Sequence, residues 1–371
     1  MTSSFDAFLL VSFGGPEARE DVVPFLENVT RGRGIPRERL EEVAHHYLAL
    51  DGVSPINGQN RELVDSIRST FARRSIDLPV YWGNRNWHPY LTPTLERIHA
   101  DGRRSVLAFV TSAYSSYSGC RQYREDLAAA LREAGLEGRL SIERVRQYFD
   151  HPGFVTPFAD GLASALAELA EAGTPAASTR VLFTTHSIPL AMADSSGPPG
   201  RFAAGGAYLA QHQAAIAAIV AAVESRGIPV PPHSLVYQSR SGPPSMPWLE
   251  PDIDEAIRAA HADGARAVVV VPVGFVSDHV EVVWDLDHEA RQTCEELGVR
   301  MIRVGTPGTH AAFVEGIADL VEERLDGAVP AAASPLGPWP AVCAAGCCRN
   351  LRGDRPALGG LDPDAGVAAP S

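Results

Sequence analysis

The sequence lacks the features of a secreted or membrane-spanning chain. No stretch approaches the roughly 20 consecutive apolar residues that a transmembrane helix needs, and the start, MTSSFDAFLL, has no basic flank or long apolar run. Basic residues are also few, because 32 of them stand against 45 acidic residues and give a formal net charge of -13. Such a charge repels a phosphate backbone. We therefore expect a cytoplasmic protein with no stable membrane insertion and no nucleic-acid partner.

Cysteine is scarce as well, with five residues in a chain of 371. These five are too unevenly placed for a disulfide framework in a protein that we expect to be reduced. Three of them, Cys343, Cys347 and Cys348, fall within six residues of one another near the end of the chain. Their spacing favours metal ligation.

Short apolar runs, rich in β-branched residues, recur along the chain and are typical of strands buried on both faces of a parallel sheet. They lie at residues 7–13, 79–83, 105–112, 140–145, 180–186, 234–239, 267–275 and 299–304. Helical patterns separate them. The alternation predicts an α/β protein of two similar, doubly wound Rossmann-like domains, each with a four-stranded parallel sheet. Function is expected at the carboxyl ends of the strands, in the cleft between the halves.

The predicted domains divide the chain into four parts. Residues 5–150 form the N-terminal domain, and residues 151–328 form the C-terminal domain, which begins where Pro and Gly follow a strand. Residues 329–352 form a Pro- and Ala-rich tether that carries the cysteines. Residues 353–371 are rich in Gly, Pro and Asp, and we predict no structure for them.

The segment RVLFTTHSIP places His186 just past the end of an apolar strand. A neutral imidazole at this position faces the predicted cleft and could accept a proton or bind a metal. The alternative is that His186 belongs to the following turn, which Ser187 and Pro189 would suit. Position alone does not decide between these interpretations.

A second strand end, VVVVPVGFVSDHVEVVWDLDHEA, leads into a helix with a run of potential ligands on one face. With α-helical spacing these side chains fall within about 100° of arc, and they are Glu281, Asp285, His288 and Glu289. Close, partly buried carboxylates raise one another's pKa and attract cations. A solvated acidic face is the alternative interpretation.

The loop after the third strand combines aromatic and basic side chains, which suit a large, flat ligand that bears carboxylates. Its members are Tyr114, Tyr117, Cys120, Arg121, Tyr123 and Arg124. Interdomain packing would also explain the tyrosines. An earlier Gly-rich loop offers Arg31 and Arg33 as further donors to ligand carboxylates. In the segment LDGVSPING, Ser54 is typical of a turn residue.

Taken together, several segments resemble the ferrochelatase family. They are SFGGPE, ENVTRGRGIP, DGVSPING, TTHSIP, YQSRSGPPSMPWLEP and VPVGFVSDHVEVVWDLDHEA, spread from residue 12 to residue 289. TTHSIP and GFVSDHVE, in this order and at this separation, are the most specific of them. The resemblance implies a chelatase-like fold and a lyase that exchanges two pyrrole protons of a porphyrin for Fe2+, its metal substrate, in haem biosynthesis.

The resemblance also implies roles for the residues of the two strand ends. His186 and Glu281 would face each other across the porphyrin, one accepting pyrrole protons and the other taking part in iron delivery. Asp285 and Glu289 would extend a line of acids from Glu281 towards solvent, on a helix widened to the π form. The division of labour between His186 and Glu281 is left open.

By the same resemblance, Ser54 and Tyr123 would contact the porphyrin. Tyr123 would be the candidate axial ligand of the product iron, and Tyr117 the second choice. Some relatives have tyrosine where this sequence has Phe13. Because phenylalanine cannot ligate iron, that family role would be vacant or filled by a tyrosine of the later loop.

Cys120 together with Cys343, Cys347 and Cys348 matches the four cysteine positions of cluster-bearing ferrochelatases, the subgroup that this chain most resembles. Four thiolates are the number that a 2Fe-2S cluster requires. Structural zinc in the same four thiolates is the alternative. Cys294 lies inside a helical pattern and is expected to be a buried or idle thiol.

The early loops are charged and Gly-rich, whereas relatives that use protoporphyrin carry an apolar lip for membrane docking. The resemblance therefore implies coproporphyrin III as the substrate, a monomer, and possible hand-off of the product to a coproheme decarboxylase. The alternatives are a chelatase for protoporphyrin or a sirohydrochlorin-type tetrapyrrole, and a haem-binding or iron-sulfur sensor without catalysis.

Overall fold

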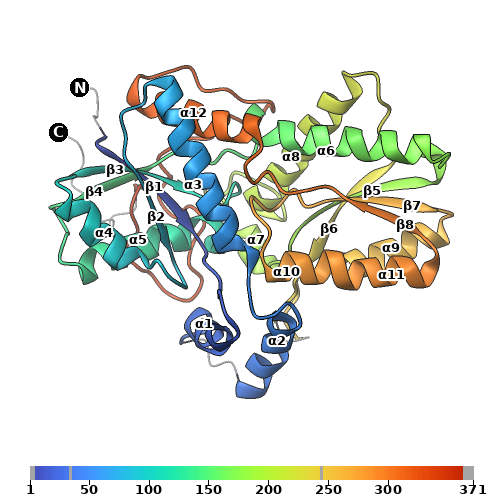
Figure 1. The fold of residues 1–371 in the computed structure, drawn as a ribbon, viewed down its shortest axis with the longest axis horizontal. Coiled ribbons are helices and arrows are strands. Elements are labelled where there is room, and N and C mark those ends of the chain that lie inside the picture. Colours follow the sequence, from blue (N-terminus) through green and yellow to red (C-terminus); the bar gives the residue numbers. More distant parts are fainter. Residues whose placement is uncertain (1–4, 33–35, 243–244, 362–371) are drawn as a thin grey trace.

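The computed structural model describes residues 5–32, 36–242 and 245–361, and it has two lobes, each built on a parallel sheet (Figure 1). The N-terminal sheet has the strand order β2-β1-β3-β4 and the C-terminal sheet the order β6-β5-β7-β8. The strands are β1 (Ala7–Ser12), β2 (Val80–Asn84), β3 (Ser105–Val110), β4 (Ser141–Arg144), β5 (Thr179–His186), β6 (His233–Gln238), β7 (Ala267–Val271) and β8 (Arg300–Arg303). The predicted α/β fold with two four-stranded parallel sheets is confirmed.

Helices cover both faces of each sheet and connect the strands (Figure 1). The α-helices are α1 (Val22–Val29), α2 (Arg37–Ala49), α3 (Pro55–Arg74), α4 (Leu91–Ala100), α5 (Gln122–Glu133), α6 (Pro152–Glu171), α7 (Leu190–Asp194), α8 (Gly206–Glu224), α9 (Ile253–Ala262), α10 (Val280–Val282), α11 (Arg291–Leu297) and α12 (Ala311–Leu325). Short 3-10 turns occur at η1 (Arg19–Asp21) and η3 (Ala176–Ser178), and π-helices at η2 (Tyr117–Arg121) and η4 (Val283–Ala290).

In both sheets the chain reverses its direction of winding between two adjacent central strands. These strands are β1 and β3 in the first sheet and β5 and β7 in the second. The loops that leave their carboxyl ends diverge to opposite faces, and such a switch point is where open α/β sheets bind ligands. The fold therefore gathers the segments after β1, β3, β5 and β7 as the candidate site.

The two lobes are joined by packing and by ion pairs. Helix α12 packs on α6 and also on α3 of the N-terminal lobe (Figure 1). At the end of α3, Arg74 pairs with Glu315 (3.1 Å), Asp319 (2.7 Å) and Glu322 (2.6 Å) of α12. The last helix of the predicted C-terminal domain thus fixes the position of the first domain.

Helix α8 differs from the sequence-based expectation. Among the described residues it is long and apolar enough, by length and composition, to span a membrane, so the expectation that no stretch approaches this limit was wrong. Its most apolar window is 56% buried inside the protein. It packs on α6 and α7, as a core helix does.

The C-terminal segment is more ordered than its composition suggested. Ala357 is 1% exposed and Leu358 is 8% exposed. The backbone N–H of Leu361 donates to the carbonyl of Cys343 at 3.0 Å. Apolar burial and backbone pairing therefore hold Ala357, Leu358 and Leu361 in place. Residues 362–371 of the predicted tail lie outside the described residues.

Candidate active site

An imidazole and a carboxylate meet at the switch point of the C-terminal sheet. His186 ends β5, and Glu281 lies on α10, which follows β7. The His186 Nε2 atom is 3.6 Å from Glu281 Oε2, and the side chains are 35% and 43% exposed. His186 Nδ1 lies 2.5 Å from the Ser187 carbonyl oxygen, so this nitrogen donates its proton there. The Nε2 atom is therefore the one that faces Glu281.

The two groups stabilise each other's charged forms. Burial disfavours the charge of His186, but the hydrogen bond to Glu281 and the negative charge of that carboxylate outweigh it and raise the imidazole pKa. Burial likewise acts against ionised Glu281, yet the contact with His186 holds the Glu281 pKa at about 2. Because the groups are coupled, they titrate as a pair. The pair can hold one proton near neutral pH and still bear a carboxylate.

Asp285 lies on the π-helix η4, one turn beyond Glu281. It accepts a hydrogen bond from the Ser239 hydroxyl and another from Gln238 Nε2 at 3.2 Å. Burial raises the pKa of Asp285 to about 7, since the Ser239 bond only partly opposes it and the charges of Glu281 and Glu289 add to the rise. Asp285 is thus poised to exchange protons near neutral pH.

The outer part of η4 faces solvent. Glu289 is exposed and accepts a hydrogen bond from Trp284 Nε1 at 2.8 Å. Trp284 stacks on His46 of α2, with ring centroids 4.3 Å apart, and also contacts the exposed His288 at 4.4 Å. The acids therefore run from partly buried Glu281 and Asp285 to exposed Glu289. A uniformly solvated face, the alternative interpretation, does not describe this arrangement.

Helices α1 and α2 form a separate projection beside α10, below the two lobes in Figure 1. Val280, next to Glu281, packs among Val22 and Phe25 of α1 and Tyr47 of α2. Phe13, in the loop after β1, meets Phe25 edge to face at 6.3 Å. The projection thereby connects the loop after β1 with the helix that carries Glu281.

The predicted porphyrin contacts Phe13 and Tyr123 lie near a common cation, Arg85. The Arg85 guanidinium is 4.4 Å from the ring centre of Tyr123 and 5.7 Å from that of Phe13. It pairs with Asp126 at 2.5 Å. Tyr123 is only 5% exposed, and burial raises its pKa despite the nearby Arg85. The sequence-based reasoning missed Arg85, although a cation directly after the strand at 79–83 was a usable signal.

The remaining predicted contacts of the early loops are scattered. Ser54 precedes α3 and is 4% exposed. It packs so closely against Gly15 that a Cβ atom added to this glycine would lie 2.6 Å from the Ser54 Cβ atom. Arg31 is exposed. Burial of Tyr90 raises the pKa of this tyrosine, and the positive charge of Arg31 partly opposes that rise. The predicted donor Arg33 lies outside the described residues.

Tyr117 belongs to the surroundings of the cysteines. Its hydroxyl donates to Glu125 at 3.2 Å, and Glu125 also accepts from Arg121 and from Asn350, each at 3.2 Å. Asn350 lies two residues beyond Cys348. Tyr117 thus helps to anchor the C-terminal segment.

Four cysteines from distant parts of the chain form one buried cluster. Cys120 comes from η2, and Cys343, Cys347 and Cys348 from the C-terminal segment, with exposures of 1%, 3%, 2% and 0%. Sulfur contacts with Cys120 and Cys347, and the charge of Arg144, hold the pKa of Cys343 well below its ordinary value against the opposing effect of burial. Cys294 lies in a different apolar core and is 1% exposed, as expected for a buried thiol.

Donors directed at the sulfurs surround this cluster. The Gly197 N–H donates to Cys348 Sγ at 3.2 Å, and Arg144 Nη2 donates to Cys343 Sγ at 3.0 Å. Among the described residues no group of three or more His, Cys, Asp or Glu side chains is placed so that it could hold a metal ion. Four thiols in one buried cluster, with a cation and an N–H directed at them, fit a larger thiolate-bound group.

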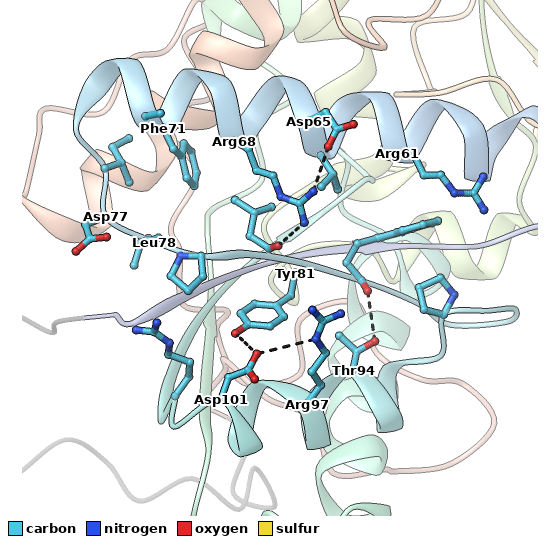
Figure 2. A pocket seen from close by; sticks show the side chains of 18 of the residues that line it. Arg61, Asp65, Arg68, Phe71, Asp77, Leu78, Tyr81, Thr94, Arg97 and Asp101 are labelled. Carbon is cyan, nitrogen blue, oxygen red and sulfur yellow. Dashed lines mark hydrogen bonds and ion pairs between the residues drawn. The ribbon is translucent and has the colours of Figure 1, made fainter.

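A groove of about 1050 Å³ lies elsewhere, against β2 and between α3 and α4 (Figure 2). Some of its charged and polar side chains pair with one another, since Arg68 pairs with Asp65 at 3.1 Å and the Tyr81 hydroxyl donates to Asp101 at 2.7 Å. Neither His186 nor any other predicted site residue lines it. The candidate site is therefore defined by the strand-end residues.

The α/β fold with two four-stranded parallel sheets and the match to a family model together identify a metal chelatase. The model of the family described as Ferrochelatase matches residues 5–325. The chain belongs to the ferrochelatase family.

Similar proteins cover nearly the whole chain. The coproporphyrin III ferrochelatase of Leifsonia xyli subsp. xyli is 56% identical over 97% of this chain and 95% of that protein. The coproporphyrin III ferrochelatase of Streptomyces coelicolor is 52% identical over 97% of each. A solved structure described as SirB from Bacillus subtilis with Fe3+ has a TM-score of 0.49 and 11% identity, over 88% of this chain and 98% of that one.

Proposed function

We propose that this chain inserts Fe2+ into coproporphyrin III, giving coproheme III and two protons. The observation that carries the proposal is the 3.6 Å contact between His186 and Glu281 at the switch point of the C-terminal sheet. Membership of the ferrochelatase family and the names of the similar proteins support the same reaction. Coproporphyrin III and Fe2+ are thus the proposed substrates.

Metal insertion needs a base for two pyrrole protons and a weak, transient site for the metal. The His186 Nε2 atom accepts a pyrrole proton, and the negative charge of Glu281 stabilises the imidazolium that results. The carboxylates of Glu281 and Asp285 offer oxygen ligands to the arriving Fe2+. Tight binding by these residues would oppose transfer, and the few groups present keep the metal site weak.

Asp285 gives the released protons a route to solvent. Its pKa of about 7 allows it to accept a proton from the His186 and Glu281 pair and to pass it on near neutral pH. Glu289, exposed at the next turn, is the outermost acid of the series. Each turnover therefore returns the pair to the state in which Nε2 can accept a proton.

The substrate is tested by anaerobic assay of the purified protein with Fe2+ and, separately, coproporphyrin III, protoporphyrin IX and sirohydrochlorin. We expect coproheme formation to exceed protoporphyrin turnover by about tenfold or more, because each charge-assisted hydrogen bond to an extra propionate contributes about 1.5–3 kcal/mol. The metallated product is followed by its absorption spectrum. Equal or greater turnover of either rival tetrapyrrole would refute the substrate assignment, and stoichiometric binding without turnover would indicate a sensor.

We also propose that Cys120, Cys343, Cys347 and Cys348 hold a 2Fe-2S cluster. The support is their common burial and the donors directed at their sulfurs. Such a cluster supplies a redox-active metal centre when bound. No step of iron insertion is assigned to it.

Replacing Cys347 with serine is expected to remove the reddish-brown colour of the isolated protein together with its bound iron and labile sulfide, because one of four thiolate ligands is lost. The measurement is visible absorbance with iron and sulfide analysis. Cys294→Ser is the matched control, since Cys294 is an equally buried thiol in another core, and it should keep the colour. A colourless wild-type protein that contains zinc would contradict the cluster.

We further propose that the protein acts as a cytoplasmic monomer and that its product passes to a coproheme decarboxylase. The net charge of -13 supports the monomer, because like charge opposes self-association. Coproheme keeps all four propionates, so an enzyme that consumes it must act on carboxylates. Light scattering of the purified chain tests the oligomeric state.

A further inference from the structure

Arg144 is a buried cation whose partners are sulfur and amide groups. It ends β4 and is 4% exposed. Its Nη1 donates to Gln147 Oε1 at 2.9 Å and its Nη2 to Cys343 Sγ at 3.0 Å, whereas its Nε is buried with no hydrogen-bond partner. Gly359 lies against its stem, with the Arg144 Cγ atom 3.8 Å from where a Cβ would be. The C-terminal segment therefore seals this guanidinium next to the cysteines.

A guanidinium cannot lose its proton in a protein, and burying it without an anion is costly. Among the residues that the structure describes, no carboxylate forms an ion pair with Arg144. Arg146, two residues further on, is equally buried, but a carboxylate neutralises its charge. It pairs with Glu323 through two hydrogen bonds of 2.8 and 2.9 Å. The counter-charge of Arg144 must come from elsewhere.

The four-cysteine site is a direct neighbour of Arg144 that can supply this charge. Its Cys343 sulfur lies 3.0 Å from Arg144 Nη2 and accepts a hydrogen bond from it. An oxidised 2Fe-2S centre with four thiolates carries two negative charges, and reduction adds a third. A fixed cation in a medium of low dielectric constant stabilises the more negative state by more than the less negative one.

We propose that Arg144 is a positioning residue of the four-cysteine site: its guanidinium holds Cys343, offsets the anionic charge of the metal centre and raises the reduction potential of that centre. This rests on the cluster proposed above, and on no step of iron insertion. The role is distinct from ligation, since Arg144 contacts a ligand sulfur and never the metal.

Arg144→Gln, Arg144→Lys and Arg146→Gln test the proposal in the full-length protein purified without oxygen. The glutamine variant removes the charge, the lysine variant keeps it without the planar fork, and Arg146→Gln removes an equally buried cation that a carboxylate neutralises. The measurements are iron and sulfide per chain, the midpoint potential from a redox titration of the visible absorbance, and the rate at which a chelator removes the iron. Iron insertion is assayed on the same samples.

For Arg144→Gln we expect a more negative midpoint potential and chelator removal about 10- to 100-fold faster, the usual effect of losing a partner of a metal ligand. Arg144→Lys should keep a potential near that of the wild type, and Arg146→Gln should lower the melting temperature without changing the potential. If Arg144→Gln binds no cluster, a cluster-bearing Arg144→Lys with a potential near that of the wild type supports the proposal.

Three results from the variants would overturn it: an unchanged potential in Arg144→Gln, an equal change in Arg146→Gln, or an Arg144→Lys variant that binds no cluster. Wild-type protein without iron and sulfide would also overturn it. Iron insertion measured on that same sample would then decide the proposed function separately.

Discussion

Replacing His186 with alanine is expected to lower the rate of coproheme formation by about 10²- to 10⁴-fold, the usual contribution of a positioned acid or base. The substitution removes the Nε2 atom that faces Glu281 at 3.6 Å. It also leaves Glu281 without the partner that holds its pKa at about 2, so protons compete with iron for that carboxylate at higher pH. The effect should fall on kcat, because the proton acceptor acts during insertion and contributes little to porphyrin binding.

His261→Ala is the control for this experiment, because His261 lies in the last turn of α9 and is not among the strand-end residues of the site. It should keep the wild-type rate. The circular dichroism spectrum of His186→Ala should match that of the wild type, because His186 is 35% exposed and its removal leaves no large cavity. Wild-type activity in His186→Ala would remove the proposed site.

Replacing Asp285 with asparagine is expected to stabilise the protein above neutral pH while slowing turnover. In the folded protein Asp285 binds its proton up to a pH of about 7, whereas its ordinary pKa is 3.8. Between these values the unfolded chain releases the proton and the folded chain keeps it, so rising pH favours unfolding. The difference corresponds to at most about 4 kcal/mol, which partial exposure reduces. Asparagine has no charge to bury and can still accept the hydrogen bond from Ser239.

The sign of this effect gives a clear pH profile. At pH 4 the free energies of unfolding of Asp285→Asn and wild type should be nearly equal, and the advantage of the variant should grow up to about pH 7 and then stay constant. Denaturant unfolding at several pH values measures it. Glu289→Gln, which changes an exposed acid of the same helix, should stay within about 0.5 kcal/mol of the wild type throughout. A variant that is less stable than the wild type at pH 8 would contradict the buried, raised-pKa carboxylate.

The sequence predicted much of the fold because the central strands of both sheets are buried on both faces. Continuous apolar runs such as residues 267–271 are therefore visible without any tertiary information. The helical spacing also predicted that Glu281, Asp285 and Glu289 share a face. That argument assumed α-helical geometry, whereas η4 has the wider π form that the family resemblance implied. A spacing of four residues keeps side chains on nearly the same side in both geometries.

Contacts between distant segments could not be predicted from local patterns. Arg144 meets Cys343 across 199 positions, and Tyr117 shares Glu125 with Asn350, which lies 225 positions beyond Glu125. Composition likewise predicted no structure for residues 353–361. The course of this segment depends on contacts with residues that are far away in the sequence, and composition does not reveal such contacts. Such residues acquire a role only when folding brings the two ends of the chain together.

The order in which a ribosome makes the chain has a consequence for the cysteine cluster. Cys120 emerges early, whereas its three partners emerge only after both sheets have been synthesised. A nascent or truncated chain that stops at residue 342 can contain both lobes, with His186 and Glu281, but lacks three of the four sulfurs. Occupancy of the proposed cluster would then mark molecules in which the segment with Cys343, Cys347 and Cys348 has joined the two lobes.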